Sequence, residues 1–225
     1  MKSWNEIKYT TDAKYYPYKK VNPSFYSTYA DLDLIQKVID YLLDMPSDDY
    51  TPPDDNSFPR VRLWKYLYYD NEYPLQQPLP NPTEKKSVLY NANEPNNANF
   101  RIIPLSLNKE AEEKAKTCIY IFKGSIIASS DMRVDTAIYF NIWTHYSLER
   151  NIKTDGDWQR TKSRTEAIEQ ALIEALHGVN IGGVGSFYFD RSQHRECGSV
   201  LLDDGKSNVG RGLRIGVSLM GADNE

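Results

Sequence analysis

The sequence has 225 residues, a mass of 26.0 kDa and a formal net charge of -4. Its 40% hydrophobic and 26% charged residues are typical of a globular protein and exclude the fibrous and membrane classes. Neither half of the chain has the basic excess that supplies nonspecific nucleic-acid affinity, so a general DNA-binding protein is not expected. The length allows one large domain, or one domain with a sizeable extension.

Proline and glycine occupy different parts of the chain. All 12 prolines lie between Pro17 and Pro104, and all 12 glycines lie between Gly124 and Gly221. Tyrosine follows the prolines, with most of its copies at or before Tyr90. We therefore predict two parts: residues 1–104, comprising an N-terminal arm, a helix and a proline-rich docking segment, and residues 105–225, comprising an α+β body.

The N-terminal part begins with about 28 residues that are rich in tyrosine and indicate an extended arm. They contain no apolar run of the kind that a secretory signal needs, so synthesis in the cytoplasm is expected. A helix should begin near residues 28–31 and end at Met45, because the residue before a proline disfavours helix. Its apolar residues recur at helical spacing: Leu32, Ile35, Val38, Ile39 and Leu42.

The segment 46–104 contains ten prolines and a dense aromatic set between Trp64 and Tyr73. Proline fixes φ and removes a backbone donor, so we expect much of this segment to be extended or turning. The aromatic residues are too many to leave in water. Three interpretations remain open: docking on a neighbouring subunit, packing as an ordinary subdomain of the same chain, or a carbohydrate-stacking platform that uses Trp64, Tyr66, Tyr68 and Tyr69.

After Pro104 the pattern becomes that of regular strands. Strands are predicted at 100–107, at 117–128 with a break at Lys123 and Gly124, and at 132–146. The last of these alternates between an apolar and a mixed face over its whole length. At about 3.3 Å per residue it could reach about 45 Å, and a strand of that length is expected to project past its own domain.

The C-terminal pattern predicts one helix and further strands. Ser163 and Glu166 have the spacing of a capping box, an apolar stripe continues to Leu176, and Gly178 should end the helix. Strands follow at 186–189, 199–202 and 213–219, with a turn at Asp204–Gly205 between the last two. The predicted fold class is α+β: an antiparallel or mixed sheet with one main packed helix in the order β-β-β-α-β-β, preceded by the N-terminal helix and the long arm.

The motifs that suggest chemistry are weak, so we expect no enzyme, catalytic residue, cofactor or metal. The Gly205-Lys206-Ser207 tripeptide lacks the earlier glycine of a phosphate-binding loop, and the glycine-rich run 180–185 follows a helix instead of a strand. Two cysteines in a cytoplasmic chain are expected to remain thiols. The cluster His194 to Cys197 leaves one enzymatic alternative, in which Cys197 is the nucleophile of a thiol hydrolase.

Three stretches of the sequence resemble virion proteins of crAss-like tailed bacteriophages. They are 54–64 (DDNSFPRVRLW), 173–185 (IEALHGVNIGGVG) and 189–194 (FDRSQH). The resemblance extends over about residues 50–220 and is to the head-to-tail connector proteins that stack beneath the portal. The strand, helix and paired strands of the C-terminal part are also similar to tail-terminator and neck proteins of other tailed phages.

The resemblance implies a structural virion protein in the neck or tail, assembled in the host cytoplasm. Its copies would form a closed ring, twelvefold favoured over sixfold, between the portal protein and the adjacent tail ring proteins. DNA would pass through the lumen without sequence-specific binding, and no membrane would be involved. Eight residues are the candidates for the subunit interface: Tyr15, Tyr16, Trp64, Tyr66, Tyr68, Tyr139, Trp143 and Ile173.

Overall fold

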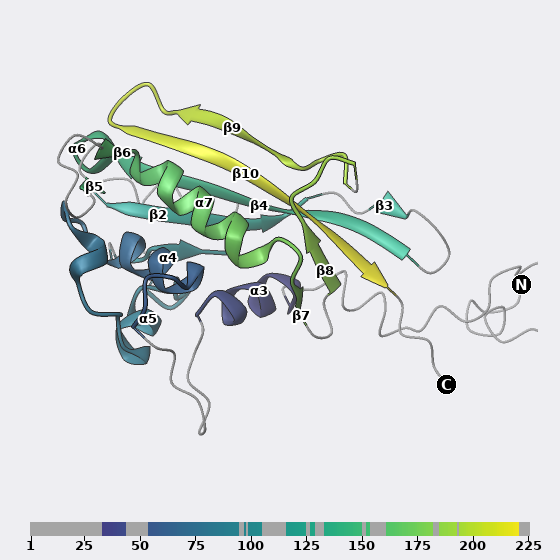
Figure 1. Ribbon diagram of the computed structural model, residues 1–225, viewed down its shortest axis with the longest axis horizontal. Helices are drawn as coiled ribbons and strands as arrows, with labels where there is room; N and C mark the ends of the chain where they lie inside the picture. The colour runs from purple at the N-terminus through teal and green to yellow at the C-terminus, as the bar shows by residue number, and fades with distance from the viewer. Residues whose placement is uncertain are drawn as a thin grey trace, which may run out of the picture.

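The computed structural model describes residues 33–43, 54–94, 97, 99–104, 116–124, 127–128, 133–149, 152–153, 161–181, 185–192 and 194–220. An eight-stranded mixed sheet carries one long helix across one face, and shorter helices from the N-terminal part lie beside that helix (Figure 1). The predicted α+β fold class is therefore confirmed.

The N-terminal part contributes helices at four places in the described chain. They are α3 (Asp33–Leu43), α4 (Pro59–Tyr68), the 3-10 helix η1 (Pro74–Gln76) and α5 (Pro82–Ser87). The helix α3 confirms the predicted one. The prediction of extended or turning chain was wrong for α4 and α5, because their prolines occupy the first helical residue. There the fixed φ suits the helix and the missing N–H would have had no partner anyway.

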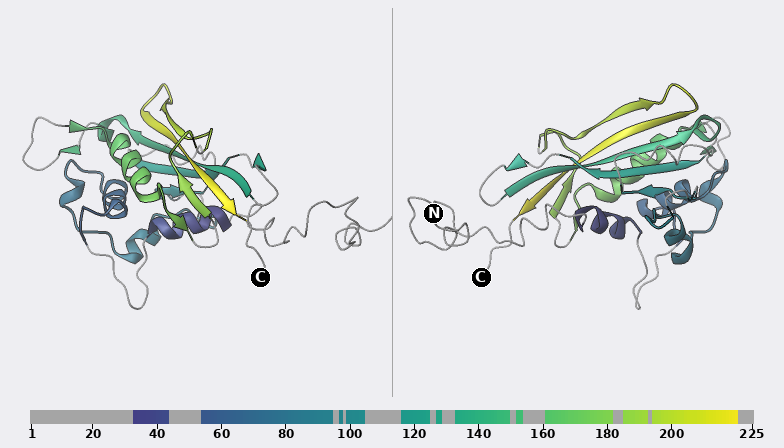
Figure 2. Two further views of the ribbon diagram at one scale, coloured as in Figure 1. Left: turned by 45° about the vertical axis from the view of Figure 1, so that its right-hand side comes forward. Right: turned by 180° about the vertical axis from the view of Figure 1, so that it is seen from behind.

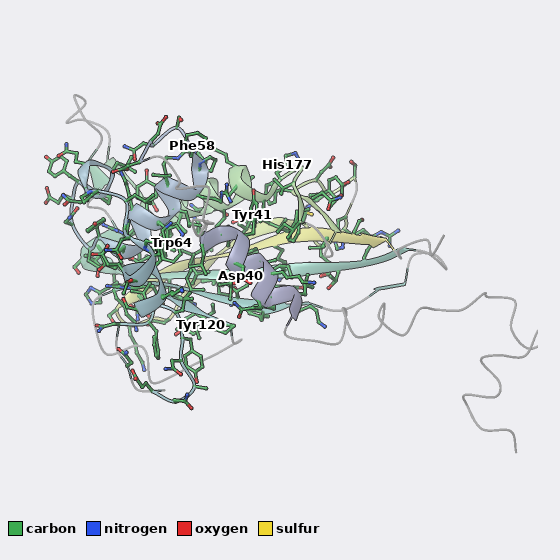
Figure 3. All side chains as sticks on the ribbon, turned by 90° about the horizontal axis from the view of Figure 1, so that it is seen from below. Asp40, Tyr41, Phe58, Trp64, Tyr120 and His177 are labelled. Carbon is green, nitrogen blue, oxygen red and sulfur yellow. The ribbon has the colours of Figure 1, made fainter. Side chains whose placement is uncertain are left out.

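The C-terminal end of α3 is held by side chains from the proline-rich segment. The Arg60 guanidinium donates to the Tyr41 carbonyl over 3.1 Å. The Trp64 indole N–H donates to the Leu42 carbonyl over 2.8 Å, and the Lys85 ammonium donates to the Leu43 carbonyl over 2.9 Å. The last carbonyls of a helix have no partner within the helix, so these three donors supply what α3 lacks. Figure 3 shows Trp64 and Tyr41 where α4 meets α3.

The sheet combines long strands from the body with short flanking ones. The main strands are β2 (Thr117–Lys123), β4 (Arg133–His145), β8 (Gly185–Tyr188), β9 (Gly198–Asp203) and β10 (Asn208–Met220). The shorter elements are β1 (Ile102–Ile103), β3 (Ile127–Ala128), α6 (Tyr146–Glu149), β5 (Ile152–Lys153), β6 (Thr161–Lys162) and β7 (Asn180–Ile181). The strand order is β1-β2-β4-β10-β8-β7, with β3 on β4 and β9 on β10, and β5 pairs with β6 as a separate hairpin.

The long strand β4 matches the predicted strand 132–146 almost residue for residue. The expectation that it projects past its own domain was wrong. Its backbone is paired with β10 from Arg133 to His145, in antiparallel register, and β2 and β3 pair with its other side. A central strand with partners on both sides has no free edge to offer a neighbouring subunit.

The long helix is α7 (Arg164–Leu176), and its ends are those that the sequence predicts. Ser163 accepts the amide of Glu166 as the N-cap, and Gly178 follows the last turn with a φ of +75°. The other half of the expected capping box is not formed. The Glu166 carboxylate binds Arg211 of β10 instead, and Glu149 accepts the amide of Thr165.

One hydrophobic core joins the two predicted parts of the chain. Leu34 of α3, Trp64 of α4, Phe140 of β4 and Leu172 of α7 are all fully buried members of a single cluster. In addition, β1 from the N-terminal part pairs in parallel with β2 of the body. The described helices of residues 1–104 are thus part of the folded body.

Candidate subunit-interaction surface

The two faces of the sheet differ in what covers them. Ile138, Phe140 and Ile142 of β4 are fully buried beneath α7. Side chains alternate along a strand, so Tyr139, Asn141 and Trp143 must point to the opposite face. Seen from behind, that face carries none of the described helices across β4 and β10 (Figure 2). We call it the open face.

An aromatic and charged row crosses the open face on paired residues of three strands. The Phe122 ring of β2 stacks on the Tyr139 ring of β4 with 5.2 Å between centroids, and the Arg214 guanidinium of β10 lies 5.0 Å from the Tyr139 centroid. The Tyr139 hydroxyl donates to the Glu196 carboxylate over 3.0 Å. Burial and the bond to Glu196 raise the pKa of Tyr139, so the ring stays neutral and keeps this bond at physiological pH.

A second row on the open face places Trp143 beside Gly210 of β10, and Asn141 beside Gly212. Gly210 pairs with Trp143, and a Cβ atom built on Gly210 would lie 2.4 Å from the Ile142 carbonyl oxygen and 3.0 Å from the indole. At Gly212 the nearest atom, on Val200, is 3.1 Å away and belongs to a side chain. Gly210 therefore gives the Trp143 ring its position on the sheet.

We expect Gly210→Ala to destabilise the protein by about 1–3 kcal/mol, because the methyl group must displace backbone as well as the indole. Gly212→Ala is the matched control and should cost less, since the Val200 side chain can move. Chemical denaturation followed by tryptophan fluorescence measures both effects. Equal losses for the two variants would contradict the role assigned to Gly210.

The strand β9 forms one edge of the sheet. Among the described strands it pairs with β10 alone, and it lies at the outer side of the sheet (Figure 1). Two of its large apolar side chains are exposed, Val200 at 49% and Leu201 at 78%. Natural edge strands are usually protected by lysine, proline or a bulge. The sequence of β9 contains no lysine or proline, and none of the described strands pairs with its outer edge.

The turn from β9 to β10 is fixed by Asp204. Its carboxylate accepts the amides of Lys206 and Asn208 over 2.8 and 3.0 Å, and Gly205 has a φ of +67°. This confirms the predicted Asp204–Gly205 turn. The tripeptide Gly205-Lys206-Ser207 is a part of the hairpin connection, which agrees with its rejection as a phosphate-binding loop.

These backbone bonds to Asp204 favour its ionised form and lower its pKa below the ordinary 3.8. The stabilisation is therefore present above pH 3.8 and lost as the pH falls through the lowered pKa. We expect Asp204→Ala to be less stable than the parent at about pH 6 and the difference to shrink towards about pH 2. Urea unfolding at both pH values checks this. A difference that stays constant across the range would contradict it.

The predicted interface residues have separate locations in the structure. Tyr139 and Trp143 lie half-buried on the open face, while Tyr68 and Ile173 are half-buried against the main core. Trp64 and Tyr66 are 0% and 4% exposed inside that core, so neither can contact a neighbouring subunit. Tyr15 and Tyr16 lie outside the described residues.

Two residues with exposed side chains were missed by the sequence reasoning, Val200 and Leu201. The run 199–202 was identified as a strand, but it has too few residues to show which side chains face water. Leu201 is exposed because nothing in the described structure covers the outer side of β9. The signal in the sequence that could have indicated an exposed edge was this apolar pair in a short strand without lysine or proline.

The two alternative sites are not assembled in the structure. A sugar platform would need Trp64 and Tyr66 at the surface, and both are buried. A thiol nucleophile must be accessible, whereas Cys197 is 2% exposed and its thiol donates to the Tyr188 carbonyl over 3.0 Å. Cys118 and Cys197 are both buried and form no disulfide, as expected for two thiols.

Neither a metal site nor a membrane span is found in the described part of the chain. No group of three or more histidine, cysteine, aspartate or glutamate side chains comes together there in a way that could hold an ion. None of the helices described above is both long and apolar enough to cross a bilayer.

The fold and its surfaces define an α+β protein with one helix-covered sheet face, one open face and an exposed strand edge. The chain belongs to the YomW family, whose model matches residues 61–198, more than half of the sequence. The name of this family is associated with phage regions of Bacillus. The match runs from α4 to the first residue of β9. No curated protein and no solved structure matches the chain.

Proposed function

We propose that this protein is a structural virion protein that forms a closed ring in the neck or tail of a phage. The ring joins the portal to the downstream tail components and surrounds the DNA channel. Membership in a phage-associated family supports the viral role. The observation that carries the assembly role is the β9 edge, where Leu201 is 78% exposed on an unprotected strand.

A closed ring requires that one surface of each copy bind a different surface of the next copy. An open strand edge suits this arrangement, because main-chain hydrogen bonds give an added strand both affinity and direction. The open face offers a second, aromatic surface with Tyr139, Trp143 and Arg214 at its centre. We propose twelve copies in preference to six, on the basis of the resemblance to phage connector proteins.

The charge of the chain is compatible with a DNA channel. A strongly basic lining would hold phosphates by counterion release, whereas this protein has a net charge of -4. The proposed role is non-enzymatic, and the protein would act as a part of the virion after assembly in the host cytoplasm.

Native mass spectrometry and electron microscopy of the purified protein, alone and mixed with the portal protein of the same phage, test the proposal. We expect a closed ring, at twelve times 26.0 kDa in the favoured case, alone or upon addition of the portal. A protein that stays monomeric and does not bind the portal at micromolar concentrations would contradict the proposed function.

We expect Leu201→Lys to abolish or strongly reduce ring formation, because the variant places a charge on the edge that assembly needs. Ser192→Lys adds the same charge at another exposed position nearby and should leave assembly unchanged. Both variants should keep the unfolding midpoint of the parent, since both side chains point into water. Normal rings from Leu201→Lys would show that the β9 edge is not the contact.

A further inference from the structure

The β9 edge has the chemistry of a site for one more strand. Its inner edge pairs with β10 over Gly198–Asp203, and its outer edge pairs with none of the described strands. Val200 is exposed on one side of the strand and Leu201 on the other. Leu201 lies on the same face of the sheet as Arg211, because the two residues are paired across β9 and β10. A partner strand with apolar or aromatic side chains on one side could cover Leu201 there and keep polar side chains on the other side.

A segment near the N-terminus has the sequence pattern of such a strand. From residue 7 to residue 15 the sequence alternates between Ile7, Tyr9, Thr11, Ala13, Tyr15 and the more polar Lys8, Thr10, Asp12, Lys14. This is the period of a half-buried β-strand, and proline is absent until Pro17. We propose that residues 6–16 of one copy add to the β9 edge of a second copy as a new strand. The inference rests on the proposed ring for the presence of a neighbouring copy.

Charge favours this occupant over a second β9 edge. Residues 1–28 contain five lysines, Glu6 and Asp12, which gives a formal charge of +3. Since the whole chain has a net charge of -4, residues 29–225 carry -7. Asp203 and Asp204 lie at one end of β9, and Asp203 is exposed. The positive segment is attracted to the negatively charged remainder of a second copy, whereas two copies of that remainder repel each other.

The reach of the segment is sufficient for a neighbouring copy. Sixteen residues, 17–32, connect residue 16 to Asp33, where α3 begins, and an extended chain spans about 3.3 Å per residue. The linker can therefore extend over about 50 Å. This exceeds the length of β9, which is about 20 Å for six residues.

Photocrosslinking from position 201 tests the proposal. The full-length protein is made with benzoylphenylalanine in place of Leu201, the isotope-labelled and unlabelled forms are mixed, and the linked peptides are identified by mass spectrometry after assembly with the portal. We expect links from position 201 to residues 1–28 that join labelled to unlabelled chains. The same probe in place of Ser192 should not give these links.

Other outcomes would overturn the inference. Links to residues 1–28 of the same chain would place the segment on its own copy, and links between two β9 strands would assign the edge to self-pairing. If rings form and position 201 links to any other part of a neighbour, the inference fails while the ring function stands. If position 201 links to residues 1–28 of another copy but no ring closes, the strand contact stands and the ring function fails.

A variant in the segment gives a second measurement. Tyr9→Asp in the full chain should raise the concentration needed for assembly at least tenfold, because it replaces an aromatic side chain of the added strand with a charge and lowers the positive charge of the segment. Ser3→Asp carries the same charge outside the proposed strand and should assemble as the parent does. Unchanged assembly of Tyr9→Asp would contradict the proposal, and matched unfolding midpoints would show that the fold is intact.

Discussion

Replacing Arg164 with leucine should lower the free energy of unfolding by about 3–5 kcal/mol, because several buried carbonyls lose their donor and each costs about 1–3 kcal/mol when left unsatisfied. Arg164 is the first residue of α7 and is fully buried. Its guanidinium donates to the carbonyls of Tyr66 and Tyr69 over 2.7 and 2.8 Å and to that of Asn71 over 2.7 Å. The substitution would leave these carbonyls buried without a donor.

The position of Arg164 explains why its charge is tolerated. A cation is unfavourable at the N-terminus of its own helix, but the guanidinium lies at the C-terminal end of α4, where cations are favoured. Burial lowers the pKa of Arg164, and Asp70 and Glu149 nearby oppose that shift. The Arg164 side chain thus connects α7 to α4 and caps the C-terminal end of α4.

Urea denaturation followed by circular dichroism measures the effect. Arg164→Lys should also be destabilised, because a single ammonium cannot span carbonyls that a planar guanidinium reaches from several nitrogens. Arg195→Leu is the control, since Arg195 is exposed, and should change stability by less than about 0.5 kcal/mol. A loss of less than about 1 kcal/mol in Arg164→Leu would contradict the role of this side chain.

Trp64→Ala should cost about 3–5 kcal/mol as well, the usual range for truncating a large core aromatic residue. Trp64 is fully buried in the core, and its indole N–H donates to the Leu42 carbonyl at the end of α3. Trp64→Phe keeps most of the packing and removes the donor, so it should lie between the parent and the alanine variant.

The control for this prediction is Phe58→Ala, at an aromatic residue of the same segment that is 46% exposed. Its loss should be small. If Trp64→Ala kept the stability of the parent and impaired assembly alone, the proline-rich segment would be a docking arm after all. Thermal unfolding of the isolated protein separates these outcomes.

The regular elements of the body were predictable because local signals agreed with the tertiary structure. The alternation of apolar and polar residues in 132–146 predicted β4, and Ser163 and Gly178 predicted the two ends of α7. The break at Lys123 and Gly124 is the end of β2. In each case the pattern of burial and the chemistry of the chain ends favoured the same structure.

The proline-rich segment was misread because proline has two opposite effects on helices. It breaks a helix from within, but it is favoured at the first position. The interval between Pro59 and Pro74 has room for the ten residues of α4, and at Pro82 the preceding Asn81 completes a capping box with Glu84. Counting prolines therefore gave less information than measuring the gaps between them.

The candidate surface was predictable in part. Tyr139 and Trp143 lie on the mixed face of β4, as the alternation required. The exposure of Leu201 was not predictable, because it depends on which strand lies at the edge of the sheet, and strand order is a property of tertiary structure. The burial of Trp64 and Tyr66 had the same cause: an aromatic residue in an amphipathic helix is compatible with a core or an interface until its neighbours are known.

The central place of β10 has a consequence for synthesis. This strand comes last among the described elements, yet it lies between β4 on one side and β8 and β9 on the other. A nascent chain that ends before residue 208 has an open β4 and no support for β9. The sheet can therefore close only after translation has passed residue 220, and shortened polypeptides from interrupted translation would lack the edge by which we propose that copies join.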